Sequence, residues 1–333
     1  MKARILFILC LFTLCLSTAV NAETDFEIVA DQTDGLNNPF GVTFDSEENL
    51  YIIEYEGGRI FKMSPGEKPS LFAGKPENGF AGDGGPVREA IFNGMHNAVC
   101  SEADQLFISD TRGNRIRKVD LNTGIITTIA GKGKGGFSGD GGPSEQALLN
   151  DPISIALNDK AHQLLISDLN NRRIRSLDLK SGIIKTIAGN GKKGVPQDGS
   201  TATKAPLVDP RASDLDSKGN LYILERGGHA LRVVNPQGQI RTVAGTGKAS
   251  SKDGPALLAG LNGPKHICID HQDRVIIADA ENHLIRLYDP KSEMVSTILG
   301  RDVKLRRPHG VAVHKGWLYI CDSYNNRVLR LKW

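Results

Sequence analysis

The chain has 333 residues, of which 41 are Lys or Arg and 38 are Asp or Glu. This length is ample for a large hydrophobic core, and it predicts either two domains or an array of repeats. The nearly balanced charge argues against a nucleic-acid-binding protein, so we expect no nucleic-acid partner.

The N-terminus has the pattern of an export signal. Lys2 and Arg4 precede the apolar run ILFILCLFTLCL and the small-residue segment STAVNA, which is the order found in cleavable signal peptides. The run is too short to span a membrane, and no later run approaches the roughly 20 apolar residues that a membrane helix needs. We predict cleavage after Ala22, a secreted or periplasmic location, and no membrane insertion of the mature chain 23–333.

The rest of the chain is built from internal repeats. The segment RIRKVDLNTGIITTIAGKGKGGFSGDGGPSEQALL (115–149) returns in altered form at 173–207 and 230–261. Repetition at a fixed spacing is the signature of a repeat architecture. Six units start near Pro39, Met95, Pro152, Pro210, Pro264 and Pro308.

Each unit divides into four strands separated by turns rich in Gly, Asn and Asp. Examples in order are HGVAV (309–313), NLYII (49–53), RIRKVD (115–120) and IITTIAG (125–131). Six units of this kind predict an all-β, six-bladed β-propeller of four-stranded antiparallel blades. The last unit stops after its third strand, so we expect the N-terminal segment FEIVA (26–30) to complete it, close the ring and leave a monomer without a large open edge.

The pattern P-x-G-V-A-V, N-L-Y-I, N-R-I-R-K-V-D, G-I-I-T-T-I-A-G and G-D-G-G-P resembles the NHL-repeat family over 26–333. The resemblance implies a single six-bladed propeller. It implies little about function, because propellers of this kind serve as binding modules, receptor ectodomains and occasional lyases.

The glycine-rich stretch GFSGDGGP (136–143) also occurs as GFAGDGGP (79–86), and glycines in G-x-G-x-x-G spacing precede the later copy. A dinucleotide site needs a following helix in a βαβ unit, which the pattern here does not predict. A calcium site needs six to eight oxygen ligands, whereas Asp83 and Asp140 supply one carboxylate per copy. We interpret the stretch as a connector between blades, with both aspartates in a structural role.

Two sets of side chains should converge at one mouth of the central channel. The residues that follow each blade-starting position are Phe40, His96, Ile153, Arg211, Lys265 and His309, and the acids that end each second strand are Glu54, Asp110, Asp168, Glu225, Asp279 and Asp322. We expect the four aspartates to be structural and to pair with third-strand arginines, for which Arg115, Arg172 and Arg327 are the candidates. Glu54 and Glu225 break the repeat, so they are candidates for ligand binding.

The histidines suggest a metal. His96 and His309 are similar in position to zinc-binding histidines of peptidyl-α-hydroxyglycine lyases, which are also six-bladed propellers and use three such residues. The third candidate, His266, lies one position late, and Arg226 is weakly similar to a basic residue near that site. A catalytic zinc needs three protein ligands. We therefore predict no cofactor, with zinc or calcium as alternatives.

The sequence thus supports an exported binding module for a protein, peptide or glycan ligand, held on the face that carries the long loops between blades. The ligand-binding candidates are Glu54, His96, Arg211, Glu225, Arg226, Lys265 and His309. The alternative is a metal-assisted lyase or hydrolase at the channel mouth. The mature chain has three cysteines without framework spacing, Cys100, Cys268 and Cys321; we expect free thiols, and a Cys268–Cys321 bridge is the alternative.

Overall fold

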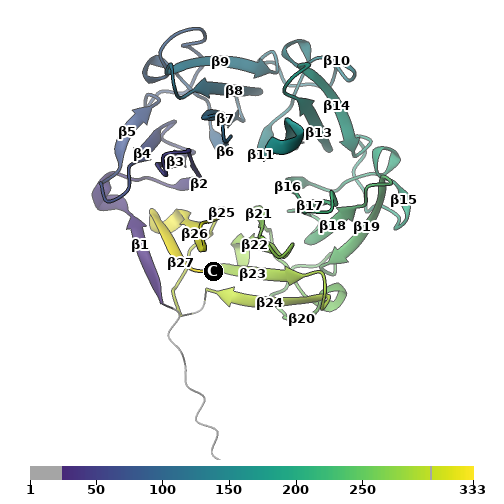
Figure 1. The fold of residues 1–333 in the computed structure, drawn as a ribbon. Helices are drawn as coiled ribbons and strands as arrows, with labels where there is room; N and C mark the ends of the chain where they lie inside the picture. Colours follow the sequence, from purple (N-terminus) through teal and green to yellow (C-terminus); the bar gives the residue numbers. More distant parts are fainter. Residues whose placement is uncertain (1–24, 301) are drawn as a thin grey trace, which may run out of the picture.

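The computed structural model describes residues 25–300 and 302–333, so the predicted signal peptide lies outside the described part. Six antiparallel sheets stand around a central channel like the blades of a propeller (Figure 1). The predicted six-bladed β-propeller is therefore confirmed.

The four strands of each blade are ordered from the channel outward. The innermost strands are β2 (Pro39–Phe44), β6 (Met95–Cys100), β11 (Pro152–Asn158), β16 (Pro210–Leu215), β21 (His266–Ile269) and β25 (Gly310–His314). The second strands are β3 (Leu50–Glu54), β7 (Gln105–Asp110), β12 (Gln163–Asp168), β17 (Leu221–Glu225), β22 (Val275–Asp279) and β26 (Trp317–Asp322). The third strands are β4 (Ile60–Met63), β8 (Arg115–Asp120), β13 (Arg173–Asp178), β18 (Ala230–Val234), β23 (Leu284–Asp289) and β27 (Arg327–Lys332). The outer strands are β5 (Ser70–Ala73), β9 (Ile125–Ala130), β14 (Ile183–Ala188), β19 (Gln239–Ala244), β24 (Met294–Leu299) and β1 (Phe26–Ala30).

The ring closes through β1, which forms the outer strand of the last blade. It pairs antiparallel with β27, so that Phe26 lies opposite Leu331 and Ile28 lies opposite Leu329. The predicted closure by residues 26–30 is confirmed. It places an N-terminal strand beside the C-terminal one and covers the edge that β27 would otherwise expose.

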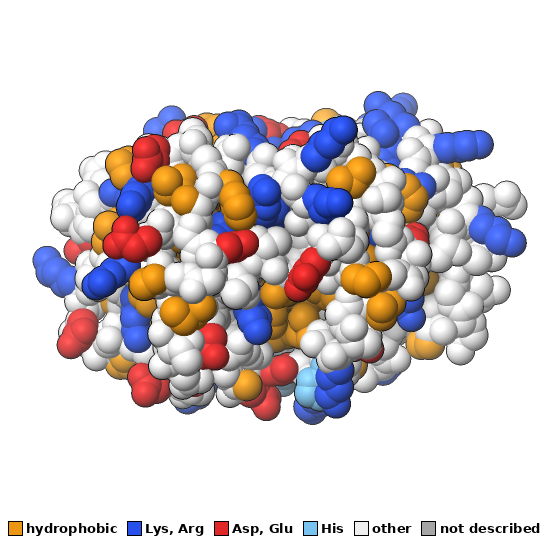
Figure 2. All heavy atoms as spheres, turned by 90° about the horizontal axis from the view of Figure 1, so that it is seen from above, with side chains coloured by type: hydrophobic (Ala, Val, Ile, Leu, Met, Phe, Trp, Pro, Cys, Tyr) orange, Lys and Arg blue, Asp and Glu red, His pale blue; other side chains and the backbone are white. Residues whose placement is uncertain are grey.

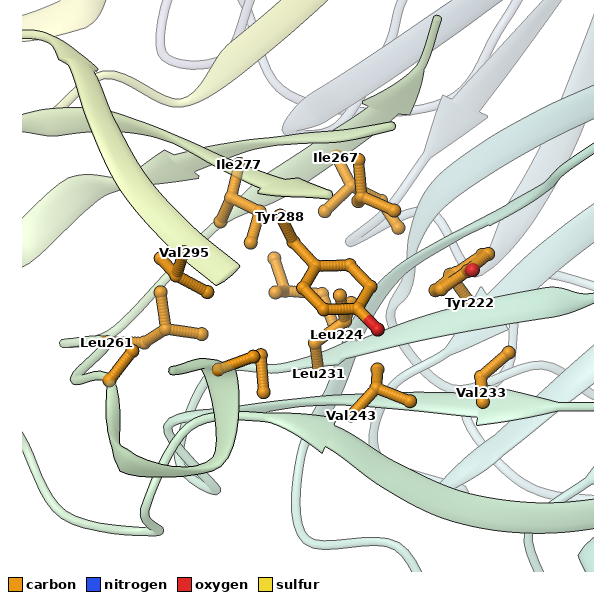
Figure 3. Close-up of a cluster of buried hydrophobic side chains, with 14 of the residues drawn as sticks. Tyr222, Leu224, Leu231, Val233, Val243, Leu261, Ile267, Ile277, Tyr288 and Val295 are labelled. Atoms are coloured by element: carbon orange, nitrogen blue, oxygen red, sulfur yellow. The ribbon is translucent and has the colours of Figure 1, made fainter. Parts of the chain in front are cut away.

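The hydrophobic core lies between the blades. Second strands such as β3 and β17 are buried along their whole length, because both faces of each sheet pack against a neighbouring blade. Figure 3 shows one such cluster, in which Tyr222 of β17 and Tyr288 of β23 come from adjacent blades. The outer strand β5 is exposed at Ser70 and Leu71 and buried at Ala73.

The glycine-rich stretch is a connector, as predicted, and it also belongs to the next blade. Gly142 and Pro143 form the short strand β10, which pairs with β14 of the following blade. The short strands β15 (Ser200–Thr201) and β20 (Gly254–Pro255) pair with β19 and β24 in the same way. Each leads into a 3₁₀ turn, namely η3 (Ser144–Gln146), η5 (Ala202–Lys204) or η6 (Ala256–Leu258). Each connector thus crosses the rim of the next blade before it reaches the channel.

Seen edge-on in Figure 2, the molecule is flattened, and acidic and basic side chains are interspersed over the visible rim. In the described part of the chain, no helix has the length and apolar character that a membrane crossing requires. Cys100, Cys268 and Cys321 are free thiols, so the alternative Cys268–Cys321 bridge is not formed.

Candidate functional site at the channel mouth

The loops between second and third strands and the ends of the connectors share one face of the propeller, which we call the connector face. The Arg226 amide donates to the Asp209 carbonyl at 3.0 Å, and the Tyr324 amide donates to the Arg306 carbonyl at 3.1 Å. These bonds join each such loop to the residues just before an innermost strand. The innermost strands therefore begin at this face.

Six side chains from six blades meet where these strands begin, and we call them the mouth ring. They line one cavity of about 10 Å³ together with Asn97, Ser154 and His266. This volume holds about one water molecule, so the ring closes the channel. The ring consists of Phe40, His96, Ile153, Arg211, Lys265 and His309. The predicted convergence of these residues is confirmed.

One side of the mouth ring is an aromatic stack. The Phe40 ring lies parallel to the His309 ring at 3.9 Å and to the Tyr55 ring at 4.8 Å, measured between centroids. The His96 ring meets Phe40 edge-on at 5.2 Å. The Arg112 guanidinium lies over Tyr55 at 5.0 Å, a cation–π contact that fixes the outer end of the stack.

The other side of the mouth is basic. Lys265 lies 3.4 Å from Glu281, which also pairs with Arg307. Arg226 pairs with Asp209 at 2.7 Å, and its side chain is 42% exposed. Beneath these pairs, Arg211 is 6% exposed.

Burial and mutual repulsion lower the affinity of these groups for protons. Desolvation, reinforced by the nearby Arg211 charge, places the pKa values of His96 and His309 well below the usual range. Desolvation also lowers the pKa of Arg211 to about 9 and the pKa of Lys265 to about 8. At neutral pH both imidazoles are therefore uncharged.

The two histidines are oriented alike. Nδ1 of His96 lies 3.2 Å from the Gly94 carbonyl, and Nδ1 of His309 lies 3.0 Å from the Arg307 carbonyl. A carbonyl only accepts, so Nδ1 carries the proton and Nε2 keeps a lone pair. A metal could use that lone pair. However, within 25–300 and 302–333 no three His, Cys, Asp or Glu side chains are arranged to hold a metal ion. The lyase or hydrolase alternative stays a prediction.

His266 also lines the channel, deeper than the mouth ring, although an offset of one residue predicts that its side chain turns to the other face of the strand. Its Nε2 lies 3.3 Å from Nδ2 of Asn97, which comes from the blade on the opposite side. This contact crosses the channel and separates the mouth from a second cavity of about 370 Å³ at the other end.

Sequence reasoning missed this second cavity. Its walls are mainly apolar residues of the innermost strands, and Asp214 is the acid placed deepest in it. Burial raises the pKa of Asp214 to about 6. The available signal was that Asp214 is the one acid at its position among the six repeats, where the others have Thr43, Val99, Ala156, Cys268 and Ala312.

The acids that end the second strands do not reach the mouth. All six are fully buried and none of them lines the mouth cavity, so the expectation that they surround the channel opening is wrong. Glu54 and Glu225 have the same role as the aspartates: they accept backbone bonds from Asn37 and Val208. The equivalent bonds to the other four come from Asn93, Asn150, Asn262 and Arg306. Each acid thus fastens the end of a connector, and a glutamate can do so as well as an aspartate.

The arginine partners also differ from the expected ones. Asp110 lies 3.7 Å from Arg117 rather than pairing with Arg115, and Asp168 lies 3.4 Å from Arg175 rather than pairing with Arg172. Arg115 is instead held over the Phe80 ring, at 3.7 Å. The carboxylates pair with Arg117 and Arg175 because these guanidinium groups are fully buried, and an unpaired charge in the interior is costly.

The remaining acids complete this scheme. Asp279 pairs with Arg286 at 3.0 Å, and Asp322 pairs with Arg327 at 2.7 Å as expected. Asp83 and Asp140 of the connectors lie 2.7 and 2.8 Å from Arg117 and Arg175. Each of these two arginines therefore joins a connector to the blade that the connector crosses.

Comparison with known proteins supports the repeat assignment. The NHL repeat family profile matches residues 305–331. The chain is 29% identical over 300 residues to the Arabidopsis thaliana protein SUPPRESSOR OF QUENCHING 1, chloroplastic, covering 86% of this chain and 28% of that protein. It is 23% identical to chicken NHL repeat-containing protein 2, covering 87% and 46%. The chain spans less than half the length of either relative.

Among solved structures, an auxiliary nutrient binding protein from Bacteroides ovatus superposes with a TM-score of 0.64 at 13% identity, covering 89% of this chain and 69% of that one. Virginiamycin B lyase from Staphylococcus aureus superposes with a TM-score of 0.56 at 12% identity, covering 93% and 100%. At such identities the likeness concerns the fold alone. The chain thus carries an NHL repeat over residues 305–331 and has the fold of a six-bladed β-propeller.

Proposed function

We propose that this propeller is an exported binding module that holds a protein, peptide or glycan ligand on its connector face, over the mouth ring. The observation that carries the proposal is the closed mouth. Six convergent side chains leave only about 10 Å³ between them, which suits contact with a surface better than enclosure of a substrate.

The residues around the mouth ring have the character of a binding surface. Tyr324 is 42% exposed and lies against Arg307, whose guanidinium is 4.9 Å from the tyrosine ring. Arg112 is exposed beside Tyr55. Tyrosine and arginine are the residues most enriched at the energetic centres of interfaces. The Bacteroides ovatus neighbour, whose description is that of a nutrient-binding protein, is consistent with such a role.

A library screen tests this proposal. Random peptides and an immobilised glycan array are screened for binding to the mature protein, to an Arg226→Ala/Tyr324→Ala variant, and to a Lys218→Ala variant altered in a turn between the first and second strands. We expect binders whose affinity falls at least about tenfold in the first variant and stays unchanged in the second. Binders whose affinity is unchanged in the Arg226→Ala/Tyr324→Ala variant and falls in the Lys218→Ala variant would contradict the proposal.

Export is part of the same proposal and rests on the N-terminal sequence pattern. N-terminal sequencing of the protein recovered outside the cytoplasm should begin at Glu23. Recovery of an uncleaved chain beginning at Met1 would contradict the proposed cleavage.

The second cavity favours one further candidate function, which is small-molecule binding at the opposite end of the channel. Its volume of about 370 Å³, and walls that combine apolar side chains with polar groups such as Asp214 and His266, suit a small molecule that carries polar groups of its own. A soluble fragment library screened by crystallography tests this function. Fragments that occupy the cavity beside Asp214 would support it, and a cavity left empty by every fragment would contradict it.

A further inference from the structure

Arg211 is a buried cation without a partner. It follows Pro210 at the start of β16 and is 6% exposed. Across residues 25–300 and 302–333, no side chain or carbonyl is close enough to its guanidinium for a hydrogen bond, an ion pair or a cation–π contact. A guanidinium carries five N–H donors, and leaving them unpaired in the interior is costly.

The neighbouring groups offset this charge only in part, because Asp209 attracts the guanidinium whereas Arg226 and Arg307 repel it. The carboxylate of Asp209 is engaged by Arg226, and the carboxylate of Glu281 is shared by Lys265 and Arg307. His96 and His309 face Arg211 as uncharged imidazoles. The surroundings therefore supply further positive charge and leave the guanidinium unbalanced.

A second unpaired donor lines the same cavity. The hydroxyl of Ser154 on β11 is buried and has no hydrogen-bond partner in the described part of the chain. Ser154, Arg211 and Lys265 come from three different blades and border one space of about 10 Å³. That space matches one oxygen atom in size, and it offers positive charge and hydrogen-bond donors.

We propose that the mouth ring is an anion site, in which Arg211, Lys265 and the Ser154 hydroxyl hold one negatively charged group, namely a carboxylate of the bound ligand. The inference rests on the proposed function, because the ligand on the connector face brings the carboxylate. One carboxylate oxygen would enter the space, and a charge-assisted hydrogen bond from a guanidinium to a carboxylate oxygen is among the strong ones. The Phe40 and His309 rings shield the site from water, and lower screening strengthens the attraction.

The first test uses simple anions as probes. Thermal unfolding of the mature protein is measured against acetate and, separately, chloride, with the bulky sulfonate anion of the buffer HEPES, which carries no carboxylate, keeping the ionic strength constant. We expect a saturable rise of Tm with acetate. The rise should be lost in Arg211→Met and weakened in Ser154→Ala, and it should persist in Lys185→Met, which alters an exposed lysine on the outer strand β14.

Arg211→Met should fold, because it replaces an unpaired buried charge with an apolar side chain of similar length. In HEPES alone its Tm should equal or exceed that of the wild type. An acetate effect of the same size in Arg211→Met would overturn the proposal. A saturable effect of chloride with none of acetate would also overturn it, because the site would then take a free inorganic ion.

The second test separates this inference from the proposed function. Peptides selected on the connector face are resynthesised with each carboxylate replaced by an amide. We expect one such replacement to lower affinity at least about tenfold in the wild type and to have no effect in Arg211→Met. If every amide peptide binds as well as its parent, the anion site is refuted while binding on the connector face stands. If no peptide or glycan depends on the mouth, the proposed function itself fails.

Discussion

Arg175 and Asp140 form an ion pair of 2.8 Å between the third strand of one blade and the glycine-rich connector that crosses it. Arg175 is completely buried and also lies 3.4 Å from Asp168. Arg117 repeats the arrangement with Asp83 and Asp110, and Arg286 repeats it with Asp253 and Asp279. The glycine-rich stretch therefore fastens neighbouring blades together.

The first prediction concerns this ion pair. Arg175→Met should lower the free energy of unfolding by about 3 kcal/mol, because it leaves Asp168 buried without a cation. Adding Asp168→Asn should cost less than the sum of the single changes, which a double-mutant cycle in urea measures. Lys75→Met, which removes an exposed ion pair with Glu89, should cost less than about 1 kcal/mol. Equal costs for Arg175→Met and Lys75→Met would contradict the role of the buried arginine.

The second prediction concerns the glycine at the start of the connector. Gly131 has a φ of +86°, and a Cβ there would lie 2.2 Å from the Asn114 carbonyl oxygen. Gly124 also has a positive φ, of +71°, but has open space around it. Gly124→Ala should cost about 1 kcal/mol of unfolding free energy from backbone strain alone, and Gly131→Ala about 3 kcal/mol from strain plus steric conflict. Similar costs, measured by chemical denaturation, would refute the close approach.

The third prediction concerns pH. Burial and the charges of Arg211, Lys265 and Arg307 keep His309 uncharged in the folded protein, whereas a histidine in the unfolded chain takes up a proton below about pH 6.5. The unfolded state therefore binds more protons, and stability falls as pH falls. Between pH 7.5 and 5.5 the wild type should lose about 1.4 kcal/mol more than His309→Gln.

Urea titrations at the two pH values measure this difference. The exposed His271→Gln serves as the control and should follow the wild type. A wild type and a His309→Gln variant that lose the same stability would show that His309 is protonated in the folded protein.

The fourth prediction concerns closure of the ring. Deleting residues 1–30 removes β1 and exposes the edge of β27, whose backbone groups then lack partners. Such an edge pairs readily with other chains. Size-exclusion chromatography should show higher oligomers or aggregates for this deletion and a monomer for the chain that begins at Glu23. A monomeric deletion variant that unfolds at the same temperature would contradict the proposed contribution of β1.

Much of the fold could be predicted because repeated residues compensate for weak single signals. The strands at 26–30 and 115–120 match the structure residue for residue. The last innermost strand begins at Gly310, one residue later than the expected 309, and the one in the unit that starts near Pro264 begins at His266. Lys265 and His309, which lie just before these strands, each make one backbone hydrogen bond to the second strand. The Lys265 amide donates to the Ala278 carbonyl, and the His309 amide donates to the Cys321 carbonyl.

The site could be predicted only where strand register decides it. The mouth ring follows from register, because equivalent residues of six equivalent strands must meet at the axis. The partner of Asp110 does not, because Arg115 and Arg117 both come from β8 and both lie over the Phe80 ring, and the sequence does not indicate which of them is buried beside the carboxylate. The contact between Asn97 and His266 depends on the width of the channel, which local sequence does not encode.

The central claim is that ligands bind on the connector face over the mouth ring. Hydrogen–deuterium exchange of the mature protein, with and without a peptide or glycan selected in the library screen, tests it most directly. The account predicts slower exchange in the loops at 111–114, 226–229 and 323–326, which surround the mouth. Slower exchange confined to the turns at 45–49, 216–220 and 270–274, at the other end of the innermost strands, would contradict it.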